Sequence, residues 1–142
     1  MRFLGLDIGT VRIGAALSDD SGTIATPFAV ISATQPQAQL AAEVRRICEE
    51  NEVDMLVVGL PLSIGGQAGG RTARLSKKLG RALGEASGLP VAFADERFTT
   101  AQADRALIGA NVDRKQRKSV VDKVAAAIML QAFLDARSDG DA

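Results

Sequence analysis

The chain of 142 residues has the size of one domain and is long enough to bury a core without covalent cross-links. Hydrophobic residues make up 46% and charged residues 24%, as in ordinary water-soluble globular proteins. No apolar run approaches the roughly 18 residues that a membrane span needs. Asp7 and Arg12 interrupt the short apolar stretch near the N-terminus, so we expect neither a signal peptide nor a membrane partner.

Histidine is absent and cysteine occurs once, at Cys48. This excludes a Ser-His-Asp triad, a Cys-His pair, a disulfide within the chain and the usual zinc sites. Chemistry must therefore use carboxylates, Lys and Arg, hydroxyls or backbone amides, and carboxylate oxygens favour Mg²⁺ or Mn²⁺. Cys48 falls in register with Leu40, Val44 and Ile47 on a predicted helix, so we expect it to pack in the core rather than to act in redox chemistry.

The net charge is zero, but the charges are unevenly distributed. Between Arg71 and Lys118 there are eleven basic and five acidic residues, a balance of +6, while the remaining six basic and twelve acidic residues give −6. A protein with one anion-binding face shows such an asymmetry. Solvated helix surfaces give the same pattern, so charge alone leaves a nucleic-acid partner open.

The first half of the chain predicts three strands, a helix and a fourth strand. The strands cover residues 2–8, 12–18 and about 23–31, and their short connections predict a meander. A helix is expected over residues 36–51, because its apolar residues recur at helical spacing. The continuous apolar run at residues 55–58 is typical of a parallel strand that is buried on both sides.

The second half predicts helices alternating with one more strand. Residues 71–87 form a helix that we expect to pack through Leu75, Leu79, Ala82, Leu83 and Ala86. A fifth strand covers residues 91–94, and Thr99 or Thr100 caps a short helix that ends near Ile108. The segment 109–118 is polar and basic, and the last helix ends near Arg137.

This order of elements predicts an α/β fold with a mixed five-stranded sheet flanked by helices, the layout of an RNase H-like domain. No internal repeat or linker divides the chain. We therefore expect a single domain over residues 1–138, followed by a frayed acidic tail at residues 139–142.

Acidic residues occur at three places in the chain where side chains from different elements can meet. Asp7 ends an apolar strand, and Asp95 and Glu96 follow the fifth strand, at the sheet edge where ligands bind in open α/β sheets. Asp122 lies early in the last helix on its inward side, in a first turn whose dipole stabilises negative charge. Together they would supply oxygen ligands for one or two hard cations at a phosphodiester.

Each acid also has a simpler interpretation. Asp7 could cap the turn that follows it, because a short carboxylate bonds readily to nearby backbone amides. Asp95 could cap the next helix and pair with Arg97. Asp122 could serve only as an acidic residue near a helix N-terminus.

Basic residues near these acids are candidates for binding backbone phosphates, which positions a nucleic acid without reading its sequence. The candidates are Arg12, Arg71, Arg74, Lys78, Arg97, Arg114, Lys115, Arg117 and Lys118.

Four short segments, in this order, give the chain a specific resemblance. They are GLDIGTVRIG at residues 5–14, VVGLPL at 57–62, DERFTT at 95–100 and VDKVAA at 121–126. Over residues 3–135 the chain resembles the YqgF family, bacterial proteins described as Holliday-junction resolvases and pre-16S rRNA nucleases.

The resemblance implies an RNase H-like fold, a cytoplasmic location and a metal-dependent nuclease site. It implies that Asp7, Glu96 and Asp122 hold Mg²⁺ or Mn²⁺, with Asp95 as the alternative to Glu96. Two departures are mild: Val11 stands where the family often has Lys, and Ser63 stands where Asn is common.

We therefore expect a hydrolase that acts in 5′-end processing of pre-16S rRNA. Its partner would be structured RNA or branched DNA, and the chain would be a monomer or a homodimer. The alternatives are a Holliday junction resolvase in DNA recombination and repair, and a nucleic-acid-binding module without catalysis. The DIGT motif at residues 7–10 also resembles the first phosphate loop of actin-like sugar kinases. Those enzymes close ATP between two such domains, whereas 142 residues provide only one.

Overall fold

The computed structural model describes residues 1–60, 70–95 and 114–140. Within these ranges the chain forms five strands and three helices. In chain order they are β1 (Phe3–Ile8), β2 (Arg12–Ser18), β3 (Ala25–Ser32), α1 (Gln37–Glu50), β4 (Met55–Leu60), α2 (Gly70–Ser87), β5 (Val91–Asp95) and α4 (Arg114–Gly140). The short helix predicted from Thr99 or Thr100 to Ile108 lies outside the described residues.

The five strands form one sheet in the order β3-β2-β1-β4-β5. Strand β1 pairs antiparallel with β2 and parallel with β4, β2 pairs antiparallel with β3, and β4 pairs parallel with β5. The predicted mixed five-stranded sheet is therefore confirmed, with β1 at its centre.

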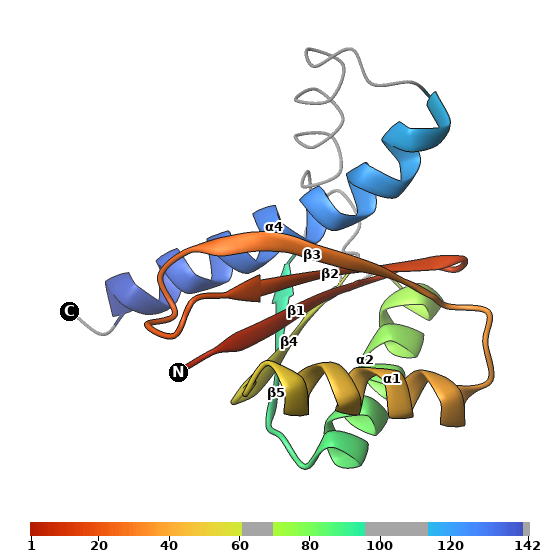
Figure 1. The fold of residues 1–142 in the computed structure, drawn as a ribbon, viewed down its shortest axis with the longest axis horizontal. Helices are drawn as coiled ribbons and strands as arrows, with labels where there is room; N and C mark the ends of the chain where they lie inside the picture. Colours follow the sequence, from red (N-terminus) through yellow and green to blue (C-terminus); the bar gives the residue numbers. More distant parts are fainter. Residues whose placement is uncertain (61–69, 96–113, 141–142) are drawn as a thin grey trace.

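The helices cover both faces of this sheet (Figure 1). Helices α1 and α2 lie against one face, and α4 runs across the other. Side chains alternate along β1 accordingly: Leu4 and Leu6 join the core beneath α1 and α2, whereas Phe3 joins the core beneath α4. No helix within the described ranges is long and apolar enough to span a membrane.

The core beneath α1 includes Cys48, as predicted. Burial, the largest influence on this thiol, raises the pKa of Cys48 to about 11. The thiol therefore stays protonated at neutral pH, and a protonated buried thiol is a poor nucleophile. These properties fit a packing role.

Helix α2 packs on the sheet through a side that is rotated from the predicted one. Leu75 and Ala86 are exposed rather than buried, Leu75 by 57%. The side facing the sheet carries Gly80 and Gly84 instead, and a Cβ atom at Gly84 would lie only 2.2 Å from a methyl group of Val91. The helix approaches β5 so closely that only small residues fit, and this rotates the larger side chains away. The other predicted positions are buried or half-buried: Leu79, Ala82 and Leu83.

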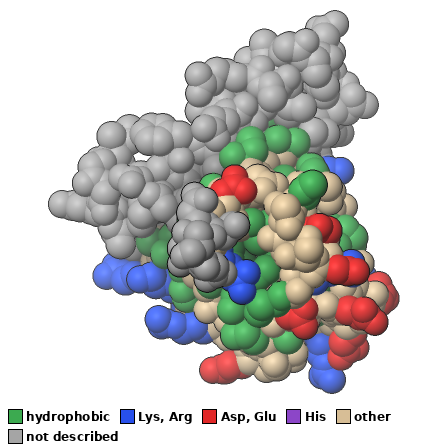
Figure 2. Space-filling view, turned by 90° about the vertical axis from the view of Figure 1, so that its left-hand side faces the viewer, with side chains coloured by type: hydrophobic (Ala, Val, Ile, Leu, Met, Phe, Trp, Pro, Cys, Tyr) green, Lys and Arg blue, Asp and Glu red, His purple; other side chains and the backbone are tan. Residues whose placement is uncertain are grey.

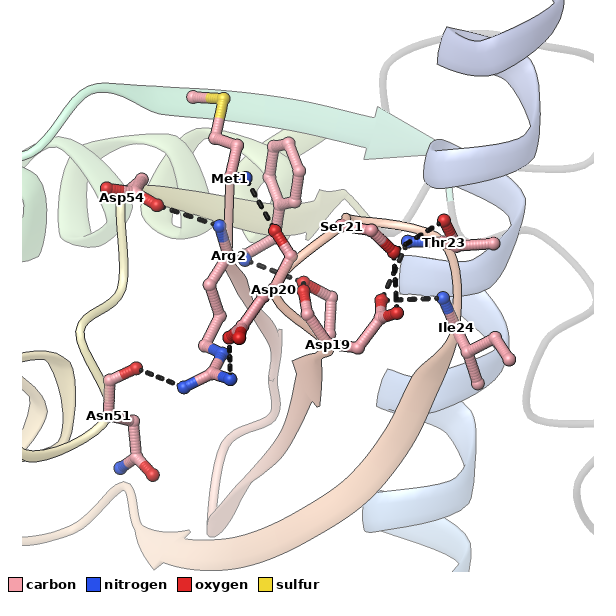
Figure 3. A network of polar contacts seen from close by, with 11 residues as sticks. Met1, Arg2, Asp19, Asp20, Ser21, Thr23, Ile24, Asn51 and Asp54 are labelled. Carbon is pink, nitrogen blue, oxygen red and sulfur yellow. Dashed lines mark hydrogen bonds and ion pairs between the residues drawn. The ribbon is translucent and has the colours of Figure 1, made fainter.

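The amino end of β1 is held by a network of polar contacts around Arg2 (Figure 3). The Arg2 guanidinium donates to the carbonyl of Asn51 and pairs with Asp20, and the Arg2 amide donates to the Asp54 carboxylate over 2.8 Å. These contacts join β1 to the β2–β3 turn and to the segment before β4. The two strands that flank β1 are thus tied to it at the end opposite Asp7.

The β2–β3 turn is organised by the carboxylate of Asp19. Its oxygens accept hydrogen bonds from the Ser21 hydroxyl and from the amides of Thr23 and Ile24, over 2.7 to 3.0 Å. Thr23 and Ile24 therefore belong to the turn, and β3 begins at Ala25 rather than near residue 23. The same hydrogen bonds, with that from Ser21 the largest, lower the pKa of Asp19 to about 2.

We expect Asp19→Asn to lower stability at neutral pH and to flatten the acid limb of the stability curve. The folded-state pKa of Asp19 is about 2, below the ordinary value of 3.8, so its ionised form stabilises the fold above pH 3.8. That contribution is lost as the pH falls from 3.8 towards 2. Urea unfolding at pH 7, 4 and 2.5 measures this change. Asp135→Asn, a surface change on α4, is the control, and equal pH dependence in both variants would contradict the assignment.

Candidate active site

Helix α4 approaches the sheet at two glycines. A Cβ atom on Gly14 of β2 would lie 1.9 Å from the backbone carbonyl oxygen of Asp122, and one on Gly5 of β1 would lie 3.0 Å from Cβ of Leu130. At Gly14 the backbones of helix and strand are in direct contact, so no larger residue fits without moving α4. This contact fixes where Asp122 stands above the sheet.

Gly14 also determines how close α4 lies to Asp7. Gly14 is the cross-strand partner of Asp7 in the β1–β2 pair, and antiparallel partners have Cα atoms about 4.5–5.5 Å apart. Along β1, Asp7 has the parity of Phe3 and Gly5, both of which contact α4, so it belongs to the face that α4 covers. The structure therefore brings Asp7 and Asp122 together. Asp7 is half-buried there.

Arg12 forms an ion pair with Asp122. Its Nε donates to Oδ2 of Asp122 over 2.7 Å, and the side chains are 40% and 27% exposed. Because the pair is partly exposed, we expect it to contribute no more than about 1 kcal/mol to stability. Arg12 reaches this position through the tight turn after β1, in which the Gly9 amide donates to the Arg12 carbonyl over 2.9 Å.

Asp122 lies further along its helix than predicted. Helix α4 begins at Arg114, eight residues before Asp122, because Arg, Lys and Gln are strong helix formers and extend the helix through the basic segment. The prediction that Asp122 occupies the first turn is therefore wrong. The helix dipole acts within the first turn only, so Arg12 is the group that stabilises this carboxylate.

The remaining acids are only partly described. Asp95 is the last residue of β5, in register with Leu60 of β4, and Glu96 lies outside the described residues. Within the described part of the chain, no three or more Asp, Glu, His or Cys side chains gather into a possible metal site. Asp7 and Asp122, on the same face of the sheet, offer only carboxylate oxygens, the donors that suit Mg²⁺ and Mn²⁺.

The predicted phosphate-binding residues fall into separate groups. Arg12 faces α4, whereas Arg74 and Lys78 are exposed on α2 on the other side of the sheet. Arg71 lies in the first turn of α2, and Arg97 lies outside the described residues. The first turns of α4 contain Arg114, Lys115, Arg117 and Lys118.

Two kinds of residue were left out of the predicted site. Lys77 and Arg81 were not among the predicted phosphate-binding residues, although their spacing of three and seven residues from Arg74 places them on the same side of α2. Gly14 was also missed as the contact point of α4, since a glycine within a strand marks a close approach but does not name its partner.

Comparisons with known proteins show which family the chain belongs to. A family model, RuvX, described as Holliday junction resolvase, matches residues 1–136. A protein of Geobacillus sp. (strain WCH70), named "Putative pre-16S rRNA nuclease", is 42% identical over 138 residues, 96% of this chain and 99% of the relative. A protein of the same name from Myxococcus xanthus (strain DK1622) is 41% identical over 141 residues, 99% of this chain and 92% of the relative.

The chain belongs to the RuvX family. This is the YqgF family that its four segments resemble, and that prediction is confirmed. Among solved structures, Thermus thermophilus RuvC in complex with a Holliday junction substrate superposes with a TM-score of 0.58 at 15% identity, covering 97% of this chain and 96% of that one. A second Thermus thermophilus RuvC structure gives a TM-score of 0.57. At this identity the likeness shows the fold alone, and it confirms the RNase H-like architecture.

Family membership also confirms the predicted class of enzyme. The relatives are named as nucleases and the RuvX family is described as a resolvase, so the chain is a hydrolase of the nuclease class.

We expect Gly14→Ala to displace α4 and to separate Asp122 from Asp7. The added methyl group would meet a backbone carbonyl at 1.9 Å, and such overpacking costs about 1–3 kcal/mol or more. Gly5→Ala is the matched comparison, because its nearest neighbour, Cβ of Leu130, lies at 3.0 Å, so a shift of a few tenths of an ångström accommodates the methyl group. Thermal unfolding should rank Gly14→Ala as clearly the less stable variant, and equal stability of the two would contradict the close approach.

Proposed function

We propose that the chain is a metal-dependent nuclease that processes the 5′ end of pre-16S rRNA. The observation that carries the proposal is the position of Asp122 directly above Gly14, the cross-strand partner of Asp7. The RuvX relatives that match over nearly their whole length are named as pre-16S rRNA nucleases, and this supports the RNA substrate. An enzyme of this kind would act in the cytoplasm.

We propose Glu96 as the third acid, in preference to Asp95. Residues two apart in a strand share a face, and Ala94 of β5 packs in the core beneath α4. Position 96 is the next position of that parity. Position 95 has the parity of Val91, which packs in the core beneath α1 and α2. The parity that position 96 shares with Ala94 supports Glu96, together with Asp7 and Asp122, as a ligand of Mg²⁺ or Mn²⁺.

Each side chain then has a defined task. Asp7 and Asp122 would hold the cation with carboxylate oxygens, and Arg12 keeps Asp122 oriented across the 2.7 Å contact. A bound Mg²⁺ or Mn²⁺ would supply a polarised water and charge neutralisation at the phosphodiester. Arg12, which is 40% exposed, can also reach a backbone phosphate from this position. The basic first turns of α4 would bind phosphates on the same side of the sheet.

A second candidate is resolution of Holliday junctions, which the description of the RuvX family favours. A junction resolvase cuts two strands symmetrically and so requires a two-fold dimer. Processing of an rRNA end requires no such symmetry. The two candidates therefore differ in the oligomeric state of the active enzyme.

We expect Asp7→Asn and Asp122→Asn each to lower kcat by about 10³-fold with Mg²⁺ or Mn²⁺, because each removes one charged ligand and the charge stabilisation it supports. Binding of uncleaved RNA, measured by fluorescence anisotropy in EDTA, should stay close to that of the native chain. Asp135→Asn, on the exposed side of α4, is the control.

Cleavage should be measured on precursor RNA, single-stranded DNA and four-way junctions in parallel. Loss of cleavage by both acid variants on RNA confirms the proposal. Unchanged cleavage by either variant would overturn the metal-site assignment, and cleavage of junctions alone by a dimer would overturn the RNA substrate.

A further inference from the structure

Four basic side chains form one row along α2. Arg74, Lys77, Lys78 and Arg81 follow the spacing of three and four residues that places helix positions on one side. Three of them are exposed and Lys77 is half-buried. Together with Ala82 and Glu85 they line a shallow groove of about 370 Å³. We call these four residues the α2 basic row.

The α2 basic row has no ion-pair partner among the described residues. Within the described part of the chain, none of its four residues makes an ion pair, and Glu85 is the one acid on α2. Helix α1 beside it differs, because Arg45 pairs with Glu49 over 2.9 Å and Arg46 lies 3.9 Å from Glu50. Pairs of this kind stabilise exposed helices. Among the described residues, the α2 row therefore keeps an excess of positive charge.

The charges on one face of the molecule are unevenly placed. Figure 2 shows most Asp and Glu side chains of this face towards its right, where a few Lys and Arg side chains also lie, while Lys and Arg side chains dominate its left. A localised positive field of this kind raises the local concentration of anions and steers a polyanion to one region. Charge complementarity therefore favours a phosphate-rich partner at the α2 basic row.

The last residue of the row reaches the edge of the sheet. The guanidinium carbon of Arg81 lies 5.9 Å from the centre of the Phe93 ring on β5, a contact that restrains the arginine side chain. Strand β5 is an edge strand, two strands away from β1 in the sheet order. At about 4.8 Å per strand, this edge is about 10 Å from the strand that carries Asp7.

The row lies on the opposite face of the sheet from the acids. Helix α2 covers the face that α4 does not (Figure 1), whereas Asp7 and Asp122 stand on the face beneath α4. A nucleic acid held at the acids must pass the β5 edge to reach the row. The phosphates bound there therefore belong to a segment that is not being cut.

We propose that the α2 basic row is a second phosphate-binding surface, which holds the backbone of a nucleic-acid segment flanking the cleaved bond. This inference rests on the proposed nuclease function and extends it by adding Lys77 and Arg81 and by separating anchoring from chemistry. Each residue that neutralises a phosphate releases counterions, which makes binding steeply dependent on salt. The row therefore contributes to affinity and to KM, and leaves kcat unchanged.

The test compares a double variant on α2 with a matched one on α1. Arg74→Ala/Lys78→Ala removes two charges from the row, and Arg45→Ala/Arg46→Ala removes two charges from the exposed side of α1. The probe is an RNA duplex of about 20 base pairs in EDTA, with affinity measured across a range of KCl concentrations. A charge-keeping variant, Arg74→Lys/Lys78→Arg, checks that fold and helicity are intact.

We expect the α2 variant to bind about tenfold more weakly near 0.1 M salt, with the slope of log affinity against log salt reduced by about 1.4 to 1.8. The α1 and charge-keeping variants should keep the native slope. An unchanged slope in the α2 variant, or an equal reduction in the α1 variant, would overturn the proposal. If the partner of the α2 basic row were an acidic protein, the slope for RNA would be unchanged in the α2 variant.

Binding in EDTA requires no cleavage, so this outcome is independent of whether the acids hold metal. Where cleavage is observed, the α2 variant should raise KM and leave kcat unchanged. A fall in kcat with unchanged KM would also contradict an anchoring role.

Discussion

The contact between the backbone of α4 and Gly14 is the constraint on which the rest of the site depends. It lets the helix lie directly on β2, where a Cβ atom would meet the Asp122 carbonyl at 1.9 Å. Because Gly14 pairs with Asp7, this one contact brings two acidic residues that are far apart in the chain to neighbouring positions on one face of the sheet. Arg12 compensates the charge of Asp122 from the neighbouring turn, so the acid can stay half-buried away from the helix N-terminus.

The two ends of β1 have different roles: the amino end is held by structural contacts, and the carboxyl end carries Asp7. The network of Arg2 fixes the amino end of the strand against the β2–β3 turn and the residues before β4. The acid stands at the other end, where strand ends and loops gather in open α/β sheets. On the opposite face, α2 lies close to the sheet through its glycines and turns its charged residues outward. The acids and the α2 basic row are consequently separated by the sheet itself.

Hydrophobic spacing was sufficient to predict the strands, the sheet and the layers, because strand and helix periods differ clearly in this chain. It was insufficient for the orientation of α2: Leu75 and Ala86 fit a helical period, but the close approach at Gly84 turned them outward. The start of α4 was placed too late, after the polar and basic segment 109–118, although Arg and Lys form helices readily. The partner of Arg12 depends on contact between residues 110 positions apart, which no local pattern contains.

A metal site at the carboxylates of Asp7 and Asp122 is central to the proposed function. Anomalous diffraction from crystals soaked in Mn²⁺ tests it most directly, because manganese scatters anomalously and chain atoms other than sulfur hardly do. We predict a peak within about 2.0–2.3 Å of carboxylate oxygens of both Asp7 and Asp122, the range of Mg²⁺-like coordination, and no such peak in Asp7→Asn. A manganese peak elsewhere, or none at these oxygens with Arg12 still bound to Asp122, would contradict the claim.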